Sequence, residues 1–379
     1  MRRIGIGIVG CGGIAQSHAA ALKELEKEGE CTVVGCADLV SEKAQSLAQK
    51  FEIPNWYADA KQLIEHPEVE AITVCTNPPF HVPATLMATA LGKHTIVEKP
   101  MTMDLAEADR AIEATRKANV RFGVIFMRRF WPAAQRARKA IDEGKLGSRL
   151  ILGDCILKWT RRPSYYGYDP QTGTREQNHA WRGMWAGENG AALVNQAVHA
   201  LDMFLWLMAP AGQLQTVYGK WANLTHPYIE AEDNAVAALK WENGALGVMS
   251  TSISTDPQLG ARITVTGDNG ATISVTEHPE GRFGVNDVWT IPGEEDEMKR
   301  VYEQDMAEAR MHFKPFPICH MWQLQEFLHA VREGRDPAVT GEEGRRSIEL
   351  IEALRLSTDS SAEIKLPIGR SSWVPPTRR

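Results

Sequence analysis

The sequence predicts an α/β protein of two domains: a doubly wound parallel domain over residues 1–126, then an α+β domain with a large, mostly antiparallel open sheet over residues 127–379. Three observations support this division. At 379 residues the chain is too long for one ordinary hydrophobic core. Up to about residue 126, short apolar runs alternate with amphipathic helical stretches, as in βαβ units. After residue 129 the apolar runs become longer and alternate in polarity, as antiparallel strands do.

The elements of the first domain follow from this alternation in chain order. Each expected strand is a short apolar run, and each expected helix has its apolar residues at helical spacing. Strands are expected at 4–9, 32–37, 71–75, 94–97 and 121–125, and helices at 16–28, 41–51, 60–66, 79–91 and 105–118.

The second domain begins with an expected helix over 133–144. Glu242-Asn243-Gly244 and Gly267-Asp268-Asn269-Gly270 are turn sequences that join neighbouring strands into hairpins. The tail is expected to form helices over 321–333 and 341–357 that pack back on the domain. The expected strands are 149–159, 214–224, 233–241, 244–252, 261–266 and 271–275.

Composition excludes several classes of protein. The formal net charge of −6 and the absence of a basic face argue against a nucleic-acid partner. The six cysteines form no CxxC pair, which is typical of a reducing, cytoplasmic environment, and no apolar stretch is long enough for a transmembrane helix. The histidines show no ligand spacing, so we expect no metal site and interpret His312 and His320 as ordinary loop and helix-start residues.

A glycine turn, Gly10-Cys11-Gly12-Gly13-Ile14-Ala15, lies between the first apolar run and the first helical stretch. This is the context of a Rossmann dinucleotide-binding turn. Gly10 permits the bend, Gly12 lets the backbone approach a pyrophosphate, and Ala15 packs the helix on the strand. The pyrophosphate is expected at the N-terminus of the helix that begins near Ile14, where amides and the helix dipole favour anions.

Asp38 follows the second expected strand. A carboxylate at this point accepts hydrogen bonds from the adenosine ribose and repels a 2′-phosphate, so we expect NAD in preference to NADP. The alternative interpretation is a capping aspartate before the helix at Ser41.

With these residues in view, the chain resembles the Gfo/Idh/MocA family, which includes glucose–fructose oxidoreductase, inositol 2-dehydrogenase and sugar 3-dehydrogenases. The resemblance rests on the glycine turn and on four further segments. It implies that Thr76, Asn77, Pro78, His81, Glu98, Lys99 and Arg129 contact the cofactor together with Gly10, Gly12, Gly13, Ile14 and Asp38. The four segments are Thr76–His81, Glu98-Lys99-Pro100, Asn195–Asp202 and Pro337–Gly344.

In similar proteins the lysine of the Glu-Lys-Pro signature stands beside the nicotinamide and the reacting hydroxyl, which implies that role for Lys99. A lysine at the end of a strand can stabilise alkoxide character as hydride leaves. Asn195, His199 and Asp202 share one stripe of an expected helix. We interpret His199 as the general base and Asn195, where many inositol dehydrogenases of the family have Asp, as an orienting residue.

The segment 159–185 interleaves aromatic residues with arginines. Such residues stack on sugar rings and bond hydroxyl groups, so we expect substrate contacts from Trp181, Arg182 and Tyr166 in addition to Lys99, Asn195 and His199. The same composition is also typical of an oligomer contact. Residues 167–177 are interpreted as a lid or as an arm that reaches a neighbour.

The predicted function is an NAD-dependent dehydrogenase that oxidises a secondary ring hydroxyl of a sugar, of a glycoside at C3, or of a cyclitol. The alternatives are an NAD-using glycoside hydrolase acting through transient C3 oxidation, and an inositol 2-dehydrogenase. A non-enzymatic NAD-binding sensor is disfavoured because such a protein has no need of Lys99 and His199. We also expect a sheet-to-sheet homodimer or a homotetramer, with Val217, Trp221, Val236 and Leu246 facing the partner.

Overall fold

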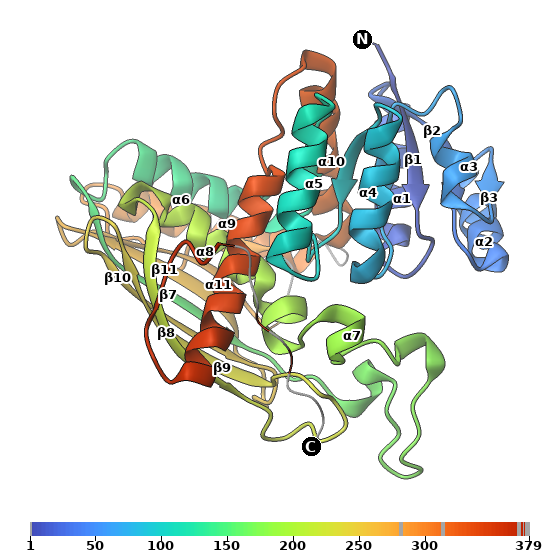
Figure 1. Cartoon of the computed structure of the whole chain (residues 1–379). Coiled ribbons are helices and arrows are strands. Elements are labelled where there is room, and N and C mark those ends of the chain that lie inside the picture. The colour runs from blue at the N-terminus through green and yellow to red at the C-terminus, as the bar shows by residue number, and fades with distance from the viewer. Residues whose placement is uncertain (1, 280–282, 312–314, 370–372, 374, 376–379) are drawn as a thin grey trace. The chain divides into compact units, whose positions relative to one another are not determined.

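The computed structural model describes residues 2–279, 283–311, 315–369, 373 and 375. The chain divides into two compact units (Figure 1). The first unit holds residues 1–127 together with 314–345, and the second holds 128–313 with 346–379. The described part of this segment, residues 315–345, thus packs with the first unit, whereas the sequence predicts it in the second domain.

The first unit contains a six-stranded parallel sheet in the order β3-β2-β1-β4-β5-β6. The order reverses between β1 and β4, and in such sheets ligands bind outside the carboxyl ends of the strands at this reversal point. Five of these strands lie within one or two residues of their predicted ranges, whereas β3 was not predicted. The strands are β1 (Ile4–Val9), β2 (Cys31–Ala37), β3 (Trp56–Tyr57), β4 (Ala71–Val74), β5 (His94–Val97) and β6 (Phe122–Val124).

Helices cover both faces of this sheet, with α1, α2 and α10 on one face and α3, α4 and α5 on the other. All six residues of β1 are buried, as expected for a strand with helices on both sides. The helices are α1 (Ala15–Lys27), α2 (Ser41–Phe51), α3 (Ala60–Ile64), α4 (His81–Ala90), α5 (Leu105–Lys117) and α10 (Pro315–Glu333), and the short helix η1 (Pro78–Phe80) precedes α4.

The second unit is built on an eight-stranded sheet in the order β13-β12-β11-β7-β10-β9-β8-β14. Among the described strands of this sheet only β7 and β10 run parallel to each other, so the prediction of a mostly antiparallel sheet is confirmed. The two predicted hairpins form as β9–β10 and β11–β12. The strands are β7 (Leu150–Lys158), β8 (Leu214–Ala222), β9 (Asn234–Trp241), β10 (Leu246–Ser252), β11 (Gly260–Gly267), β12 (Thr272–Glu277), β13 (Gly284–Val285) and β14 (Ile364–Lys365).

Helices α6 and α8 and the second half of α11 cover one face of this sheet (Figure 1). The helices of the second unit are α6 (Pro132–Asp142), α7 (Trp185–Glu188), the π-helix η5 (Ala192–Ala197), α8 (Val198–Leu207) and α9 (Glu295–Met311). Helix α11 (Gly341–Ser360) begins in the first unit and ends in the second. Short 3-10 helices are η2 (Met127–Phe130), η3 (Pro163–Tyr166), η4 (Gln177–His179) and η6 (Ala209–Ala211).

The opposite face of the large sheet is exposed and partly apolar. Val236 and Leu246 point outward as predicted. The prediction for Trp221 is wrong, because this half-buried side chain alternates onto the covered face of β8 and packs on Trp185. The prediction for Val217 is wrong, because this side chain is fully buried and Tyr218 is exposed in its place. Val217 and Tyr218 are adjacent and both apolar, so the alternation of polarity does not decide which of them faces the core. A shift of one residue exchanges the two faces of a strand.

All six cysteines are buried free thiols. No helix among the described residues combines the length and the apolar character that crossing a membrane requires.

Candidate functional site

The glycine turn after β1 opens the carboxyl edge of the parallel sheet. Gly10 has a φ of +90°, and a Cβ added there would lie 2.8 Å from the Cys75 carbonyl carbon and from the Thr76 nitrogen, so this position requires glycine. A Cβ added at Gly12 or Gly13 would meet no described atom within 4 Å. No described side chain caps the N-terminus of α1, which begins at Ala15 after Ile14. The turn therefore fits a pyrophosphate.

Asp38 joins the turn after β2 to the glycine turn. Its Oδ2 accepts a hydrogen bond from the Cys11 amide at 2.8 Å, and its Oδ1 accepts one from the Val40 amide at 2.9 Å. The second contact is a local turn before α2. The capping interpretation is wrong, because the N-cap residue of α2 is Val40 and no described side chain caps this helix end. Because each carboxylate oxygen has two lone pairs, both oxygens keep the capacity to accept a ribose hydroxyl.

The loop after β4 brings Thr76, Asn77 and Pro78 to the same edge, next to Gly10. Thr76 Oγ1 is buried and has no hydrogen-bond partner among the described residues, which is the condition expected of a ligand contact. Pro78 is buried and begins η1, whereas Asn77 is exposed.

His81 has a different environment from the one we predicted for a cofactor contact. Its Nε2 lies 2.9 Å from the Thr76 carbonyl oxygen and its Nδ1 lies 2.8 Å from the Pro100 carbonyl oxygen. Burial lowers the pKa of His81, so the ring is neutral near pH 7 and donates to one carbonyl at a time. The ring joins the loop after β4 to the loop after β5, and we reassign His81 to holding these loops together.

Glu98 and Lys99 follow β5, which is the neighbour of β4. Glu98 is buried and lies 2.9 Å from His18 Nε2 and 3.3 Å from His320 Nε2, measured at Oε1. These contacts hold the pKa of the Glu98 carboxyl well below its usual range despite its burial. His320 is therefore not an ordinary helix-start residue, and His312 lies outside the described residues. Spacing along the sequence does not indicate this cluster, because its members come from α1, from the loop after β5 and from α10.

In the second unit, Asn195 belongs to the π-helix that precedes α8 rather than to one regular helix with His199 and Asp202. A π-turn changes which side chains align, so the predicted stripe does not follow regular α-helical spacing here. The Asn195 amide nitrogen donates to Glu188, and its oxygen accepts from Tyr165 at 3.2 Å and from Gln196 at 3.0 Å. These bonds set which way the amide points.

Two buried glutamates hold this segment. Glu232 Oε1 accepts from the amides of Ala191 at 3.1 Å and Leu193 at 2.9 Å, and so fixes the start of the π-helix. Glu188 accepts from the Gly183 amide as well as from Asn195. The backbone that carries Asn195 is thus anchored by carboxyl groups that solvent does not reach.

His199 is buried in the first turn of α8. One turn further, Asp202 forms a bidentate pair with Arg129, with Arg129 Nε 2.7 Å from Oδ2 and Nη2 2.5 Å from Oδ1. Both partners are nearly inaccessible, at 4% exposure for Arg129 and 2% for Asp202. The sequence predicts Arg129 as a cofactor contact and gives no signal for this partner, which ties α8 to η2.

The aromatic segment 159–185 contains both core and surface residues. Tyr166 is 1% exposed and packs in a cluster with Ala191, Ala192, Ile229, Ala231 and Ile253. It has no surface for a substrate in this structure, and we assign it to the core. The Arg182 guanidinium lies over the rings of Tyr165 and Trp181, at 4.5 and 5.3 Å from their centroids, and Arg182 and Trp181 remain partly exposed.

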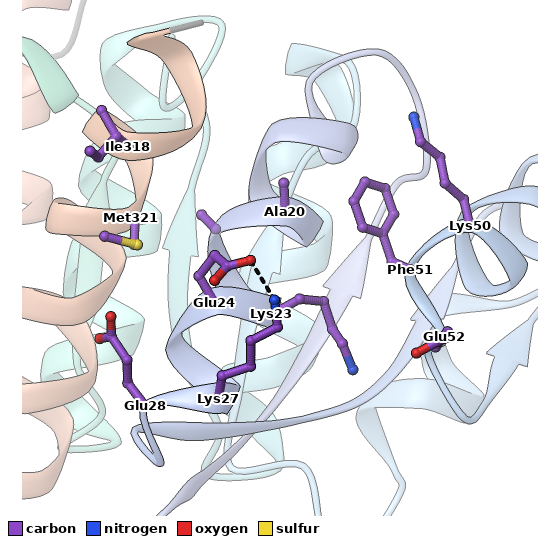
Figure 2. Close-up of a pocket in the computed structure, with 11 residues that line it drawn as sticks. Ala20, Lys23, Glu24, Lys27, Glu28, Lys50, Phe51, Glu52, Ile318 and Met321 are labelled. Carbon is purple, nitrogen blue, oxygen red and sulfur yellow. Dashed lines mark hydrogen bonds and ion pairs between the residues drawn. The ribbon is translucent and has the colours of Figure 1, made fainter. Parts of the chain in front are cut away.

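A groove of about 630 Å³ lies on the outer side of α1, between the end of α2 and the start of α10 (Figure 2). Lys27 and Glu24, which line the groove, form an ion pair of 2.7 Å, and Phe51, Ile318 and Met321 add apolar surface. None of the predicted site residues lines this groove. It is separate from the carboxyl edge of the sheet.

Comparison with known proteins agrees with this arrangement. Residues 4–126 match the Gfo/Idh/MocA family described as an oxidoreductase family with an NAD-binding Rossmann fold, and residues 138–366 match its C-terminal alpha/beta domain. The chain is 25% identical over 366 residues to the myo-inositol 2-dehydrogenase of Thermotoga maritima, a match covering 95% of this chain and 98% of that protein. It is 24% identical over 369 residues to the NAD⁺-dependent scyllo-inositol 2-dehydrogenase of Bacillus subtilis, covering 96% of each.

Among solved structures, the chain is similar to the WlbA dehydrogenase of Bordetella pertussis in complex with NADH and UDP-GlcNAcA. The TM-score is 0.79 and the sequence identity 26%, with 97% of this chain and 100% of that chain covered. Both domains of the family are thus present in the order found here. The protein is an NAD(P)-dependent oxidoreductase of the Gfo/Idh/MocA family.

Proposed function

We propose that this protein is an NAD-dependent dehydrogenase that oxidises a secondary ring hydroxyl of a sugar, of a glycoside at C3, or of a cyclitol. The observation that carries the proposal is the alignment of the glycine turn, Thr76 and Lys99 at the carboxyl ends of the adjacent strands β1, β4 and β5. Relatives matched along almost the whole chain are named as inositol dehydrogenases, and a similar structure contains NADH with a nucleotide sugar.

The proposed cofactor is NAD rather than NADP. Asp38 places a carboxylate after β2, and its neighbour Leu39 is 81% exposed and uncharged. A 2′-phosphate near Asp38 would meet a negative charge with no arginine adjacent in sequence to neutralise it. A ribose 2′-hydroxyl instead can donate to the free lone pairs of that carboxylate.

The chain's own residues supply binding and proton transfer. A bound nicotinamide would supply the acceptor for the hydride that leaves the carbon bearing the hydroxyl. Lys99 donates a hydrogen bond to the alcohol oxygen and stabilises its developing negative charge. His199 takes the hydroxyl proton, so one hydride and one proton leave the substrate and a ketone forms. Asn195, whose amide is oriented by Glu188 and Tyr165, positions the substrate or His199 and does not exchange protons.

The experiment that tests this function is a panel of glucosides, free hexoses and inositols incubated with NAD and followed at the NADH absorbance. Lys99→Ala should lower turnover by on the order of a hundredfold or more with NAD binding nearly unchanged. Lys61→Ala, at an exposed lysine of α3, is the matched control and should behave as wild type. Full activity of the Lys99 variant would remove that residue from the mechanism.

His199→Ala should lose activity that added imidazole partly restores, because only a base is missing. An unchanged pH–rate profile would exclude His199 as the base.

Two alternatives share this site and are separated by the same panel. An inositol 2-dehydrogenase is favoured by the relatives that match almost the whole chain, whereas Asn195 differs from the aspartate of many such enzymes. A glycoside hydrolase that uses NAD transiently would release the aglycone without net accumulation of NADH, since the cofactor is regenerated in each turnover.

We further propose a homodimer, or a tetramer built from it, that pairs through the exposed face of the eight-stranded sheet. Leu246 and Leu152 are register neighbours on this face, at 55% and 42% exposure, and Val248 and Val236 add 45% and 53%. Tyr218 extends the patch onto β8. Apolar residues gathered on one sheet face favour a partner over water, and a two-fold axis lets the same patch cover itself.

A further inference from the structure

Three segments of the first unit meet at one buried carboxylate. His18 of α1, Glu98 at the end of β5 and His320 of α10 are 0%, 5% and 1% exposed. The two histidine Nε2 atoms lie 2.9 and 3.3 Å from the same oxygen of Glu98, Oε1. The imidazole rings themselves lie close, with centroids 5.0 Å apart. A buried charge with two donors on one oxygen is a strongly directional arrangement.

The hydrogen bonds assign the proton positions. His18 Nδ1 lies 2.8 Å from Thr73 Oγ1, so the threonine hydroxyl donates to Nδ1 while Nε2–H donates to Glu98. Burial lowers the pKa of His18, which keeps this ring neutral near pH 7. The network is therefore an ionised carboxylate held by imidazole N–H groups, with Thr73 fixing the tautomer of one of them.

The second carboxylate oxygen of Glu98, Oε2, contacts the backbone of the proposed catalytic residue Lys99. Glu98 Oε2 accepts a hydrogen bond from the backbone amide of Lys99 at 3.1 Å. On the other side of the lysine, the carbonyl of Pro100 lies 2.8 Å from His81 Nδ1. Buried side chains thus contact the Lys99 amide and the Pro100 carbonyl, at the point where the chain leaves β5.

We propose that His18 and His320 are positioning residues for Lys99. By holding the Glu98 carboxylate in one orientation, they fix the Lys99 amide and with it the point from which the lysine side chain extends. The proposal rests on the role of Lys99 given above, and it adds a residue of α10 that neither the motif nor its spacing indicates. The ligand atoms of the three side chains lie within 4.8 Å of one another, so a divalent cation in place of the N–H protons is the competing explanation.

Hydrogen–deuterium exchange of the full-length protein tests the proposal without any substrate. His320→Leu removes the N–H donor at similar volume, whereas His320→Gln retains an N–H at the corresponding distance along the side chain. We expect the peptide covering residues 94–102 to exchange at least tenfold faster in the leucine variant and within twofold of wild type in the glutamine variant. His329→Leu, on the same helix but bonded to Glu30, should leave this peptide unchanged.

Thr73→Val gives a second variant if the leucine protein does not fold. It removes the hydroxyl that fixes the His18 tautomer at equal volume, and we expect at least threefold faster exchange in the same peptide. Unchanged exchange in both donor-removing variants, or equal acceleration in His320→Leu and His320→Gln, would overturn the proposal. One zinc per chain in the purified wild type, lost in His320→Leu, would also overturn it in favour of a metal site.

Activity measurements separate this proposal from the proposed function. On a substrate found in the panel, His320→Leu should lower kcat at least tenfold, with KM and the Kd for NAD within threefold, and His320→Gln should retain half of the wild-type kcat. Accelerated exchange with no turnover of any alcohol would contradict the dehydrogenase and leave the positioning network intact. Unchanged exchange in variants of an active enzyme would contradict the positioning network and leave the dehydrogenase assignment intact.

Discussion

The turn after β1 contains two glycines with different expected roles. We expect Gly10 to be required for folding and Gly12 to be required for cofactor binding. Gly10 has a φ of +90°, and a Cβ there would lie 2.8 Å from two backbone atoms of the loop after β4. The backbone conformation costs an L-residue roughly 1–2 kcal/mol, and forced contacts with backbone that cannot move add about 1–3 kcal/mol. We therefore expect Gly10→Ala to destabilise the first unit by about 2–5 kcal/mol.

Gly12→Ala is the matched variant two residues on. A Cβ at Gly12 meets no described atom within 4 Å, so the free energy of unfolding should change by no more than about 0.5 kcal/mol. The added methyl group instead occupies the surface that the pyrophosphate is proposed to approach, and we expect the Kd for NAD to rise at least tenfold.

Thermal unfolding without cofactor and calorimetric titration with NAD measure the two effects separately. Wild-type stability in Gly10→Ala would refute the steric argument. Wild-type affinity in Gly12→Ala would refute the placement of the cofactor at this turn.

Three further predictions follow from charge, surface and titration. The wild type should prefer NAD to NADP by about 3 kcal/mol or less, and Asp38→Ser should narrow that gap in competition titrations; equal use of both cofactors by the unmodified enzyme would contradict the assignment. Val248→Lys should convert the proposed dimer to a 42.1 kDa monomer in light scattering at micromolar concentration, whereas the exposed control Leu224→Lys should not; a wild type that is monomeric at micromolar and nanomolar concentrations excludes the dimer. Burial lowers the pKa of His18 and His81, so the unfolded chain takes up protons first and Tm should fall as pH drops below about 6.5; a Tm that is constant between pH 7 and 5 would show that these rings are not buried and neutral.

The regular elements were predictable because burial imposes a period on them. Strands β1 and β5 and helix α2 have the predicted bounds. Each strand is a short apolar run, and the helix has apolar residues at helical spacing, so the local sequence alone indicates which residues are buried. Strand β3 is only two residues long and not buried, too short for any periodic signal. Helix α9 was also missed, because its sequence is rich in charge and has no clear apolar stripe.

The candidate site was predictable where it depends on local motifs and not where it depends on distant contacts. Gly10, Asp38 and Lys99 each follow a strand, so their position at the carboxyl edge follows from the order of elements. His320 reaches Glu98 only because α10 returns to pack on α1. The burial of Tyr166 likewise depends on neighbours such as Ile253, far away in sequence.

Anchoring by buried carboxylates is common to the segments that carry the proposed catalytic residues. In the first unit Glu98 accepts the amide of Lys99, and in the second Glu232 accepts the amides at the start of the π-helix that leads to His199. Each segment has left regular α or β structure at that point, so its backbone groups need partners from side chains. A carboxylate supplies a stronger acceptor than a carbonyl and keeps its strength in a buried environment. The two anchored segments therefore hold their geometry before any substrate arrives, and differences in substrate preference are expected to arise from partly exposed residues such as Arg182.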